Sequence, residues 1–522
     1  MDGLLARARH SRRQLLVGAL GAAGVALLAA CGGTASPTAA PTAAPAKPAE
    51  PTKPAAAAAN TPAAGAAATK PAAGGTASPA AGGAASPAAA GGTAAPQTNV
   101  QSGVSGGTPT APTPTLPAGA KAVVFWIPWG QPERQKWVLD TGVQFREKYA
   151  DQALQMEFVG FGNMRQRWIA AQQAGQMPEL FNVGFQEVGA AYVAGAVEAA
   201  DGLFQDMKGK DTFFEGPLSV WTYQGKYFGL PWYVFPRLFY YRKDLYDAKG
   251  VKLPTDANSW YEGAKALTQA PDKWGSALAP SDHAPEPIDY YMRGAGSAMF
   301  DKDGKVLLDS PEGIEAVDFF AKLIKDTGPQ GTANYTEDDQ IKLFISKDVG
   351  YVLTWPAILQ WMAQQAQAHV KDLGAMVPPG KTTKPKPITS NIGFGMGKSA
   401  KNLDGAKKYL QFIYQDDQYL GFQHSIAGVY PVTKSMAASP KFQDHPILKQ
   451  FPEVVKVGQD ASNEGVEAGY LYGWNPGNTL ALATNPGLAQ MMQAIVLQNV
   501  PVKQAVDDQV KRMNAAIAQM RR

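Results

Sequence analysis

From Lys121 onward, short apolar runs alternate with longer amphipathic segments. A run of four to eight apolar residues is typical of a buried strand, whereas apolar positions three or four residues apart indicate a helix. The pattern predicts, in order, a strand at 122–127, a helix at 132–149, a strand at 154–159, a helix at 164–174 and a strand at 180–183. This alternation favours a parallel sheet with helices on its faces.

Capping residues mark the ends of three later helices. Ser310 followed by Pro311 is a typical helix start, and Gly328 closes the segment that begins there. Asn402 is expected to cap a helix over 403–415, and Pro501 to open the last helix of the chain. These signals predict an α/β fold that continues to the C-terminus.

Composition separates the first part of the chain from the rest. The 522 residues include no Phe, Trp or Tyr before Phe125. A segment without aromatic residues and with few branched aliphatic ones cannot bury enough apolar surface to offset its chain entropy. The folding part is therefore about 400 residues long, which is enough for two lobes.

Residues 1–31 have the three parts of an export signal. A positive end that contains Arg12 and Arg13 is followed by an apolar run and by Cys31, the one cysteine of the chain. The small residues before Cys31 resemble a lipobox, and the arginine pair resembles a twin-arginine motif. A transmembrane helix and an ordinary secretory signal are the alternatives, although a span needs about 20 apolar residues. We expect a lipid anchor on Cys31 that holds the protein at the extracytoplasmic face of the cell membrane.

Residues 32–120 form a low-complexity run of Ala, Pro, Gly, Thr and Ser. Proline removes amide donors, and glycine and serine leave the backbone unconstrained. The composition predicts a disordered tether between the anchor and the folded part.

Charge and cysteine content exclude several classes of function. The formal net charge is +4, and basic residues are interspersed with acidic ones, so no basic stripe favours nucleic-acid binding. A single cysteine precludes a disulfide within the chain, and the five histidines are scattered, with none at metal-ligand spacing. We expect a monomer with no cofactor and no metal.

Three stretches resemble the extracellular solute-binding proteins of ABC importers, in particular the sugar-binding lipoproteins of family 1. They are 123–129 with 145–149, then 174–181, and then 224–231 with 238–245. Glu179 stands where the family usually has Asp, and Phe228 stands where it usually has Tyr. Weaker matches follow in family order, so the resemblance covers nearly all of 120–520.

The resemblance implies a periplasmic-binding-protein fold of type II, in which two α/β lobes joined by a hinge close on a ligand. Lobe 1 is expected at 121–236 plus 389–431, and lobe 2 at 237–388 plus 432–522. The implied function is delivery of a carbohydrate to the permease subunits of an ABC transporter, without enzymatic activity.

Candidate ligand-binding residues follow from the position of strand ends and from sugar chemistry. Ligands of open α/β sheets bind beyond the carboxyl ends of the strands. Aromatic rings match the apolar face of a sugar, and polar side chains match its hydroxyl rim. We expect contacts from Trp126, Trp129, Asn163, Glu187, Trp232, Tyr233, Arg237, Trp355, Asn391, Tyr430 and Trp474. Core packing is the alternative for the aromatic residues, and an interlobe salt bridge is the alternative for Arg237.

Two rival functions stay open at this point. A carbohydrate-active enzyme needs a pair of carboxylates, which the abundant Asp and Glu do not exclude, but no nucleophile elbow or phosphate-binding glycine loop is present. The same fold also binds ferric iron, polyamines, phosphodiesters and peptides. Tyr240 and Tyr241 resemble the adjacent tyrosines of ferric-iron binders, although packing within a strand also explains them.

Overall fold

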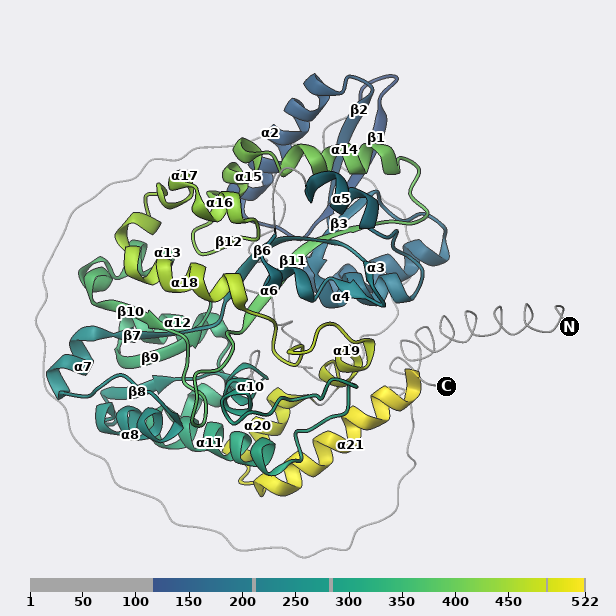
Figure 1. Cartoon of the computed structure of the whole chain (residues 1–522). Helices are drawn as coiled ribbons and strands as arrows, with labels where there is room; N and C mark the ends of the chain where they lie inside the picture. Colours follow the sequence, from purple (N-terminus) through teal and green to yellow (C-terminus); the bar gives the residue numbers. More distant parts are fainter. Residues whose placement is uncertain (1–115, 209–212, 281–284, 485–486, 521–522) are drawn as a thin grey trace, which may run out of the picture. The chain divides into compact units, whose positions relative to one another are not determined.

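The computed structural model describes residues 116–208, 213–280, 285–484 and 487–520. All of these residues belong to one compact unit (Figure 1). The predicted export signal, with Arg12, Arg13 and Cys31, and nearly all of the predicted tether lie outside the described residues. The division into two lobes and the boundaries between them stay predictions.

The larger sheet has six strands in the order β12-β6-β11-β3-β1-β2. Strand β1 pairs in parallel with both β2 and β3, as the strand–helix alternation predicts. The six strands are β1 (Lys121–Ile127), β2 (Gln152–Phe158), β3 (Leu180–Gly184), β6 (Leu230–Pro236), β11 (Thr389–Met396) and β12 (Tyr430–Pro431).

The parallel arrangement holds for the first three strands, for which it was predicted, but does not extend to the rest of the sheet. Strand β11 runs antiparallel to both β3 and β6, and β12 runs antiparallel to β6. The alternation covered only the first three strands, whereas β11 and β12 return from far along the sequence and enter in the opposite direction. The sheet is therefore mixed.

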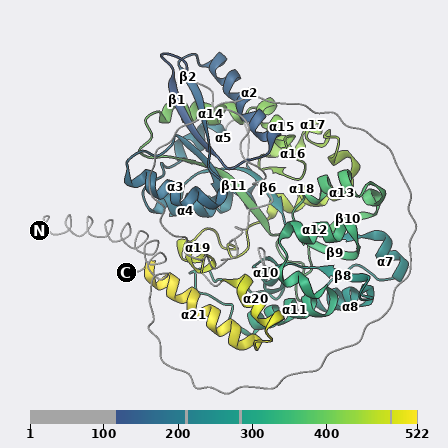
Figure 2. The ribbon, with the colours of Figure 1, turned by 180° about the vertical axis from the view of Figure 1, so that it is seen from behind.

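Helices cover both faces of the six-stranded sheet (Figures 1 and 2). One face packs against α2 (Pro132–Lys148), α14 (Leu403–Ile413) and α15 (Asp416–Gln423), and the other against α3 (Phe161–Gln173) and α4 (Phe185–Val193). Successive residues of β1 point to opposite faces, so Phe125 joins the first core cluster and Trp126 the second. Short elements complete this region: α5 (Asp201–Lys208), α6 (Glu215–Ser219), β4 (Thr222–Tyr223) and β5 (Lys226–Tyr227).

The smaller sheet has four strands in the order β10-β7-β9-β8, which are β7 (Leu238–Arg242), β8 (Lys273–Ala277), β9 (Asp348–Thr354) and β10 (Leu373–Met376). A separate apolar cluster lies between this sheet and several of the helices. The helices of this part are α7 (Lys243–Lys249), α8 (Ala257–Leu267), α10 (Pro285–Gly294), α11 (Pro311–Thr327), α12 (Glu337–Ser346) and α13 (Ile358–Gln365).

The C-terminal helices are α16 (Lys434–Ala438), α17 (Pro440–Gln443), α18 (Pro452–Glu464), α19 (Pro476–Leu482), α20 (Leu488–Leu497) and α21 (Val502–Met520). Helix α19 packs on both α4 and α21. It therefore joins the C-terminal segment to the helices of the six-stranded sheet.

The predicted helix caps are confirmed. The Ser310 side chain accepts a hydrogen bond from the backbone N–H of Gly313 at the start of α11, which ends before Gly328. Asn402 accepts from Gly405 at the start of α14, and α21 begins directly after Pro501. Each cap satisfies a backbone N–H that the helix itself leaves unpaired.

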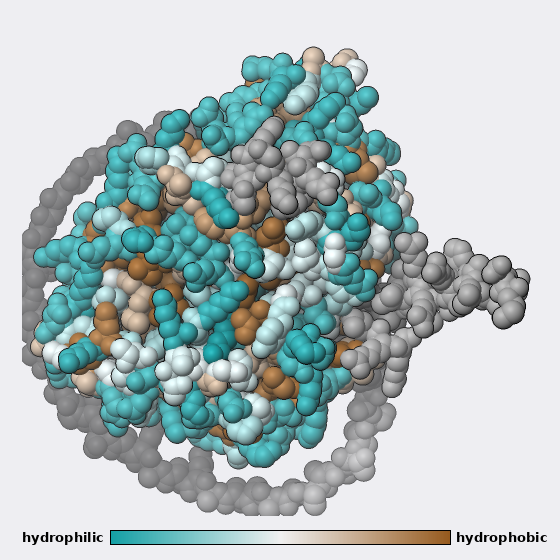
Figure 3. Space-filling view, viewed as in Figure 1, coloured by the Kyte–Doolittle hydropathy of each residue, from teal (hydrophilic) through white to brown (hydrophobic). Residues whose placement is uncertain are grey.

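The face of the molecule in Figure 3 is mostly hydrophilic, with small separate apolar areas. Among the described residues, no helix combines the length and the apolar character needed to cross a bilayer.

Candidate ligand-binding site

One residue, Arg237, separates β6 of the larger sheet from β7 of the smaller one. It is buried, and its guanidinium forms ion pairs with Glu337 and Glu286, the second at 3.5 Å. Burial by itself lowers the pKa of Arg237, but the two carboxylates outweigh it and raise the pKa. Glu337 also accepts hydrogen bonds from the Thr354 hydroxyl at 2.7 Å and the Trp355 N–H at 3.3 Å. The crossing is thus fixed to the end of β9. Arg237, Glu286 and Glu337 all fall in the range expected for lobe 2, so these ion pairs do not join the two expected lobes, and ligand contact by Arg237 stays a prediction.

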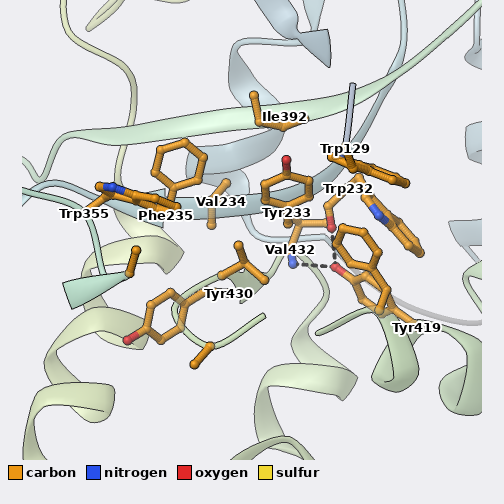
Figure 4. Close-up of a cluster of buried hydrophobic side chains, with 14 of the residues drawn as sticks. Trp129, Trp232, Tyr233, Val234, Phe235, Trp355, Ile392, Tyr419, Tyr430 and Val432 are labelled. Carbon is orange, nitrogen blue, oxygen red and sulfur yellow. Dashed lines mark hydrogen bonds between the residues drawn. The ribbon is translucent and has the colours of Figure 1, made fainter. Parts of the chain in front are cut away.

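Three aromatic rings, Tyr233, Phe235 and Trp355, form a row beside this crossing (Figure 4). The rings of Tyr233 and Phe235 are stacked with centroids 6.2 Å apart, and the ring of Trp355 lies 5.4 Å from that of Phe235. The first two belong to β6, whereas Trp355 follows β9. We call these three residues the aromatic row. It joins side chains of the two sheets where the strands of the larger sheet end.

A β-bulge in β6 sets the direction in which the side chains of Tyr233 and Phe235 point. Ile392 of β11 pairs with Tyr233, but the next residue, Gly393, pairs with Pro231, so Trp232 is an extra residue. An extra residue shifts the alternation of side chains along the strand. Trp232 and Tyr233 consequently both contact the ring of Phe422, with centroids 5.0 and 5.3 Å away, although neighbours in a regular strand point to opposite faces.

Trp232 lies inside the core and contacts Phe422, as Tyr233 of the aromatic row also does. Its ring packs between β6 and α15, at 4.5 Å from Tyr419 and 5.0 Å from Phe422, and it is fully buried. Figure 4 shows the hydroxyl of Tyr419 hydrogen-bonded to the backbone of Trp232 and of Val432. This environment is that of a packing residue.

Trp126 and Trp129 lie in different core clusters. The indole N–H of Trp126 donates to Glu157 at 3.1 Å, and its ring packs against the Arg167 guanidinium. Trp129 lies beyond the end of β1, and its ring is 5.1 Å from Phe422. Of the two tryptophans, Trp129 lies closer to the aromatic row, because the ring of Phe422 that it contacts also contacts Tyr233.

Three predicted residues lie on or against α3 and α4. Asn163 is exposed on α3, and Glu187 forms a two-point ion pair with Arg165, with both contacts at 3.0 Å. Trp474 precedes α19 and covers Gly189 of α4 so closely that a Cβ at this glycine would lie 2.5 Å from the indole. Trp474 holds the C-terminal segment against α4, and Glu187 joins α4 to α3. Ligand contact by these three residues stays a prediction.

Asn391 lies on β11 and Tyr430 on β12, which are the two strands that flank β6. The amide oxygen of Asn391 accepts from the Trp221 indole at 2.9 Å, and its amide group donates to the Pro217 carbonyl at 2.7 Å. Tyr430 pairs with Val234 of β6 and is buried. Both amide atoms of Asn391 are therefore committed to the fold, and ligand contact by these two residues stays a prediction.

The structure adds two residues that the sequence analysis missed. Phe235 follows Tyr233 at the two-residue spacing that places side chains on one face of a strand, which is a signal visible in the sequence. Arg134 lies four residues before Val138 and eleven before Phe145, so it occupies the buried stripe of α2. A cation on the apolar stripe of a helix is the sequence signal by which it could have been found.

The side chains of Tyr240 and Tyr241 point to opposite faces of β7, as those of adjacent strand residues do. Tyr240 belongs to the first core cluster, and Tyr241 packs against the separate apolar cluster of the smaller sheet. They do not converge on one point, so packing within the strand explains them.

Within the part of the chain that the structure describes, one group of side chains has atoms close enough to hold a metal ion. Asp244, His369 and Asp372 offer ligand atoms within 4.8 Å of one another. The sequence separates His369 from Asp244 so widely that spacing gave no hint of the group. Both oxygens of Asp244 already accept from Arg242, at 2.7 and 2.6 Å, and this ion pair accounts for its position.

The family profile described as bacterial extracellular solute-binding protein matches residues 141–450. The chain belongs to this family. A putative binding protein of Brucella abortus is 28% identical over 57% of this chain and 73% of that relative. The mannitol-binding protein of Pseudomonas aeruginosa is 23% identical over 59% of this chain and 78% of the relative.

Solved structures of solute-binding proteins share the fold. The maltose-bound MalE3 of T. maritima matches with a TM-score of 0.61 at 18% identity, over 76% of this chain and all of the other. The GacH receptor of Streptomyces glaucescens matches with a TM-score of 0.63 at 17% identity, over 76% and 99%. The predicted type II periplasmic-binding-protein fold is thus confirmed. This solute-binding family and its structural neighbours are binding proteins.

Proposed function

We propose that this solute-binding protein captures a carbohydrate outside the cytoplasm and delivers it to the permease subunits of an ABC importer. The observation that carries the proposal is the aromatic row, because rings from two sheets meet where strands of the larger sheet end. Flat rings match the C–H face of a sugar. Relatives named for arabinooligosaccharide and mannitol binding support the same ligand class.

The anchoring of the protein belongs to the same proposal. After export through the signal that contains Arg12 and Arg13, a lipid on Cys31 holds the protein at the cell membrane, and residues 32–120 serve as a tether. Covalent lipid contributes about 0.8 kcal/mol per buried CH₂, so two acyl chains anchor stably. The protein acts as a monomer, with no cofactor, no catalysis and no nucleic-acid partner.

Ligand contact is proposed chiefly for Trp129, Tyr233 and Trp355, with Arg237 as the residue that fixes the crossing. The hinge at Arg237 opens and closes the space between the lobes, as in other two-lobed binders.

A calorimetric titration with single saccharides tests the proposal. Trp355→Ala should weaken sugar binding at least tenfold, or by about 1.4 kcal/mol. Trp274→Ala is the matched control, because Trp274 is partly exposed on β8 and lies outside the aromatic row. Circular dichroism establishes that both variants fold, and Trp355→Phe should retain most of the affinity. Equal affinity of Trp355→Ala and the parent protein would remove the row from the binding site.

A further inference from the structure

Arg134 differs from the other buried arginines. Arg237 pairs with Glu337, Arg242 with Asp244 and Arg293 with Asp289, and each pair brings a carboxylate to the guanidinium. Arg134 is 0% exposed, yet no carboxylate of the described residues lies within ion-pair distance of it.

The hydrogen-bonding capacity of Arg134 is mostly unused. One terminal nitrogen, Nη1, donates to the Tyr233 hydroxyl at the long distance of 3.5 Å. Its Nε and its Nη2 have no hydrogen-bond partner. A guanidinium carries five N–H donors in a fork that fits an oxyanion, and most donors of this fork have no acceptor among the described residues.

Aromatic rings surround the guanidinium. It lies 5.0 Å from the ring centroid of Tyr233, 5.1 Å from that of Phe422 and 5.7 Å from that of Trp129. Contacts between a cation and ring faces are attractive but do not replace the lost hydration of a fully buried charge. The enclosure therefore leaves Arg134 without the negative charge that would balance it.

The position of Arg134 relates it to the proposed sugar site. Tyr233 is the first ring of the aromatic row, and its hydroxyl is the one polar contact that the Arg134 side chain makes with the described residues. Arg134 also lies in the first turn of the 17-residue helix α2, where the helix dipole favours negative charge. A sugar lying along the row would bring a substituent on its last ring against this guanidinium.

We infer that the ligand is an acidic carbohydrate, whose carboxylate or phosphate group binds the free fork of Arg134 beside the Tyr233 hydroxyl. The inference rests on the proposed function and specifies its ligand class. An oxyanion supplies the missing counter-charge, and two parallel N–H···O bonds from the fork orient it. A neutral sugar leaves the charge unbalanced and binds more weakly.

Calorimetric titration of the full chain with matched saccharides tests this inference. The probes are oligogalacturonides with their carboxyl-reduced neutral counterparts, and sugar phosphates with their parent sugars. We expect the acidic member of one pair to bind at least tenfold more tightly than its neutral member. A preference within the oligogalacturonide pair indicates that the bound group is a carboxylate, and a preference within the sugar phosphate pair indicates a phosphate.

Two variants assign the preference to Arg134. Arg134→Met should bring the ratio of the two affinities close to one, whereas Arg146→Met, on an exposed arginine of the same helix, should keep the ratio of the parent protein. Without ligand, Arg134→Met should melt at or above the parent temperature, because it removes an unbalanced buried charge.

The outcomes separate the two proposals. If neutral sugars bind as tightly as acidic ones, or if Arg134→Met keeps the acidic preference, this inference is overturned while sugar binding stands. A melting temperature of unliganded Arg134→Met more than 5 °C below the parent would likewise overturn it, because Arg134 would then be a stabilising part of the core. If no saccharide of either kind binds, the proposed function itself fails.

Discussion

At the scale of single residues, ring contacts rather than burial separate a tryptophan that packs in the core from one that borders the proposed site. Trp232 touches rings from β11, α2 and α15, with its centroid 5.3 Å from Phe394 and 5.8 Å from Trp137. Trp355 instead contacts Phe235 at the crossing between the sheets. Both indoles are buried, but only that of Trp355 lies where strands from both sheets end.

Trp232→Ala should therefore act on stability. Removing a fully buried indole from a packed cluster costs about 3–5 kcal/mol, through lost burial and the cavity that remains. Chemical denaturation followed by circular dichroism measures this loss. A variant as stable as the parent protein, but unable to bind sugar, would return Trp232 to the binding site.

Trp232 also shows where residue-level prediction from sequence stops. The sequence places Trp232 and Tyr233 together after Pro231, and both looked suited to stacking on a sugar. The bulge that turns both side chains toward Phe422 depends on pairing with Ile392 and Gly393, which are about 160 residues away. No local pattern records that pairing.

At the scale of elements, local signals predicted the elements themselves well. The caps Ser310 and Asn402 act within three residues of their own position, and the structure confirms both. The direction of β11 could not be predicted from local sequence, because its partners β3 and β6 lie more than 150 residues earlier. Arg134 shows a third case, since its place on the apolar stripe of α2 was visible but its lack of a carboxylate partner was not.

The contact between α4 and Trp474 gives a prediction for a glycine. Alanine in a helix is normally more stable than glycine by about 0.5–1 kcal/mol. At Gly189 the added Cβ would lie 2.5 Å from the Trp474 ring, so Gly189→Ala should instead destabilise by about 1–3 kcal/mol. Gly202→Ala on α5 is the control, because nothing lies within 4 Å of its Cβ position. If thermal melting shows both variants gaining stability, Trp474 does not pack on α4.

The histidine pair between α15 and the segment after α17 predicts a pH effect. Burial, and then repulsion from His424, hold the pKa of His445 below its ordinary value of 6.5. As pH falls below 6.5, the unfolded chain takes up a proton that the folded chain resists, so stability falls between pH 6.5 and the folded pKa. The melting temperature of His445→Gln should fall less over this range than that of the parent. Parallel melting curves of the two proteins from pH 7 to pH 5 would contradict the assignment.

At the scale of the whole molecule, the arrangement of two sheets joined through Arg237 suits a protein that holds a guest. The buried pairing of Arg237 with Glu286 and Glu337 ties the crossing to the smaller sheet. The aromatic row then brings rings of both sheets together on one side of β6. Family membership could be predicted from ordered motifs along 120–520, but the ligand class depends on which side chains meet in space.

Native mass spectrometry of the purified full chain tests the central claim most directly. The chain is incubated in turn with a pool of saccharides and with a pool of amino acids, polyamines, phosphodiesters, peptides and ferric iron. The account predicts one saccharide bound per chain, released with its mass unchanged, and no adduct from the second pool. An adduct formed only from the second pool, or a saccharide returned as cleavage products, would contradict it.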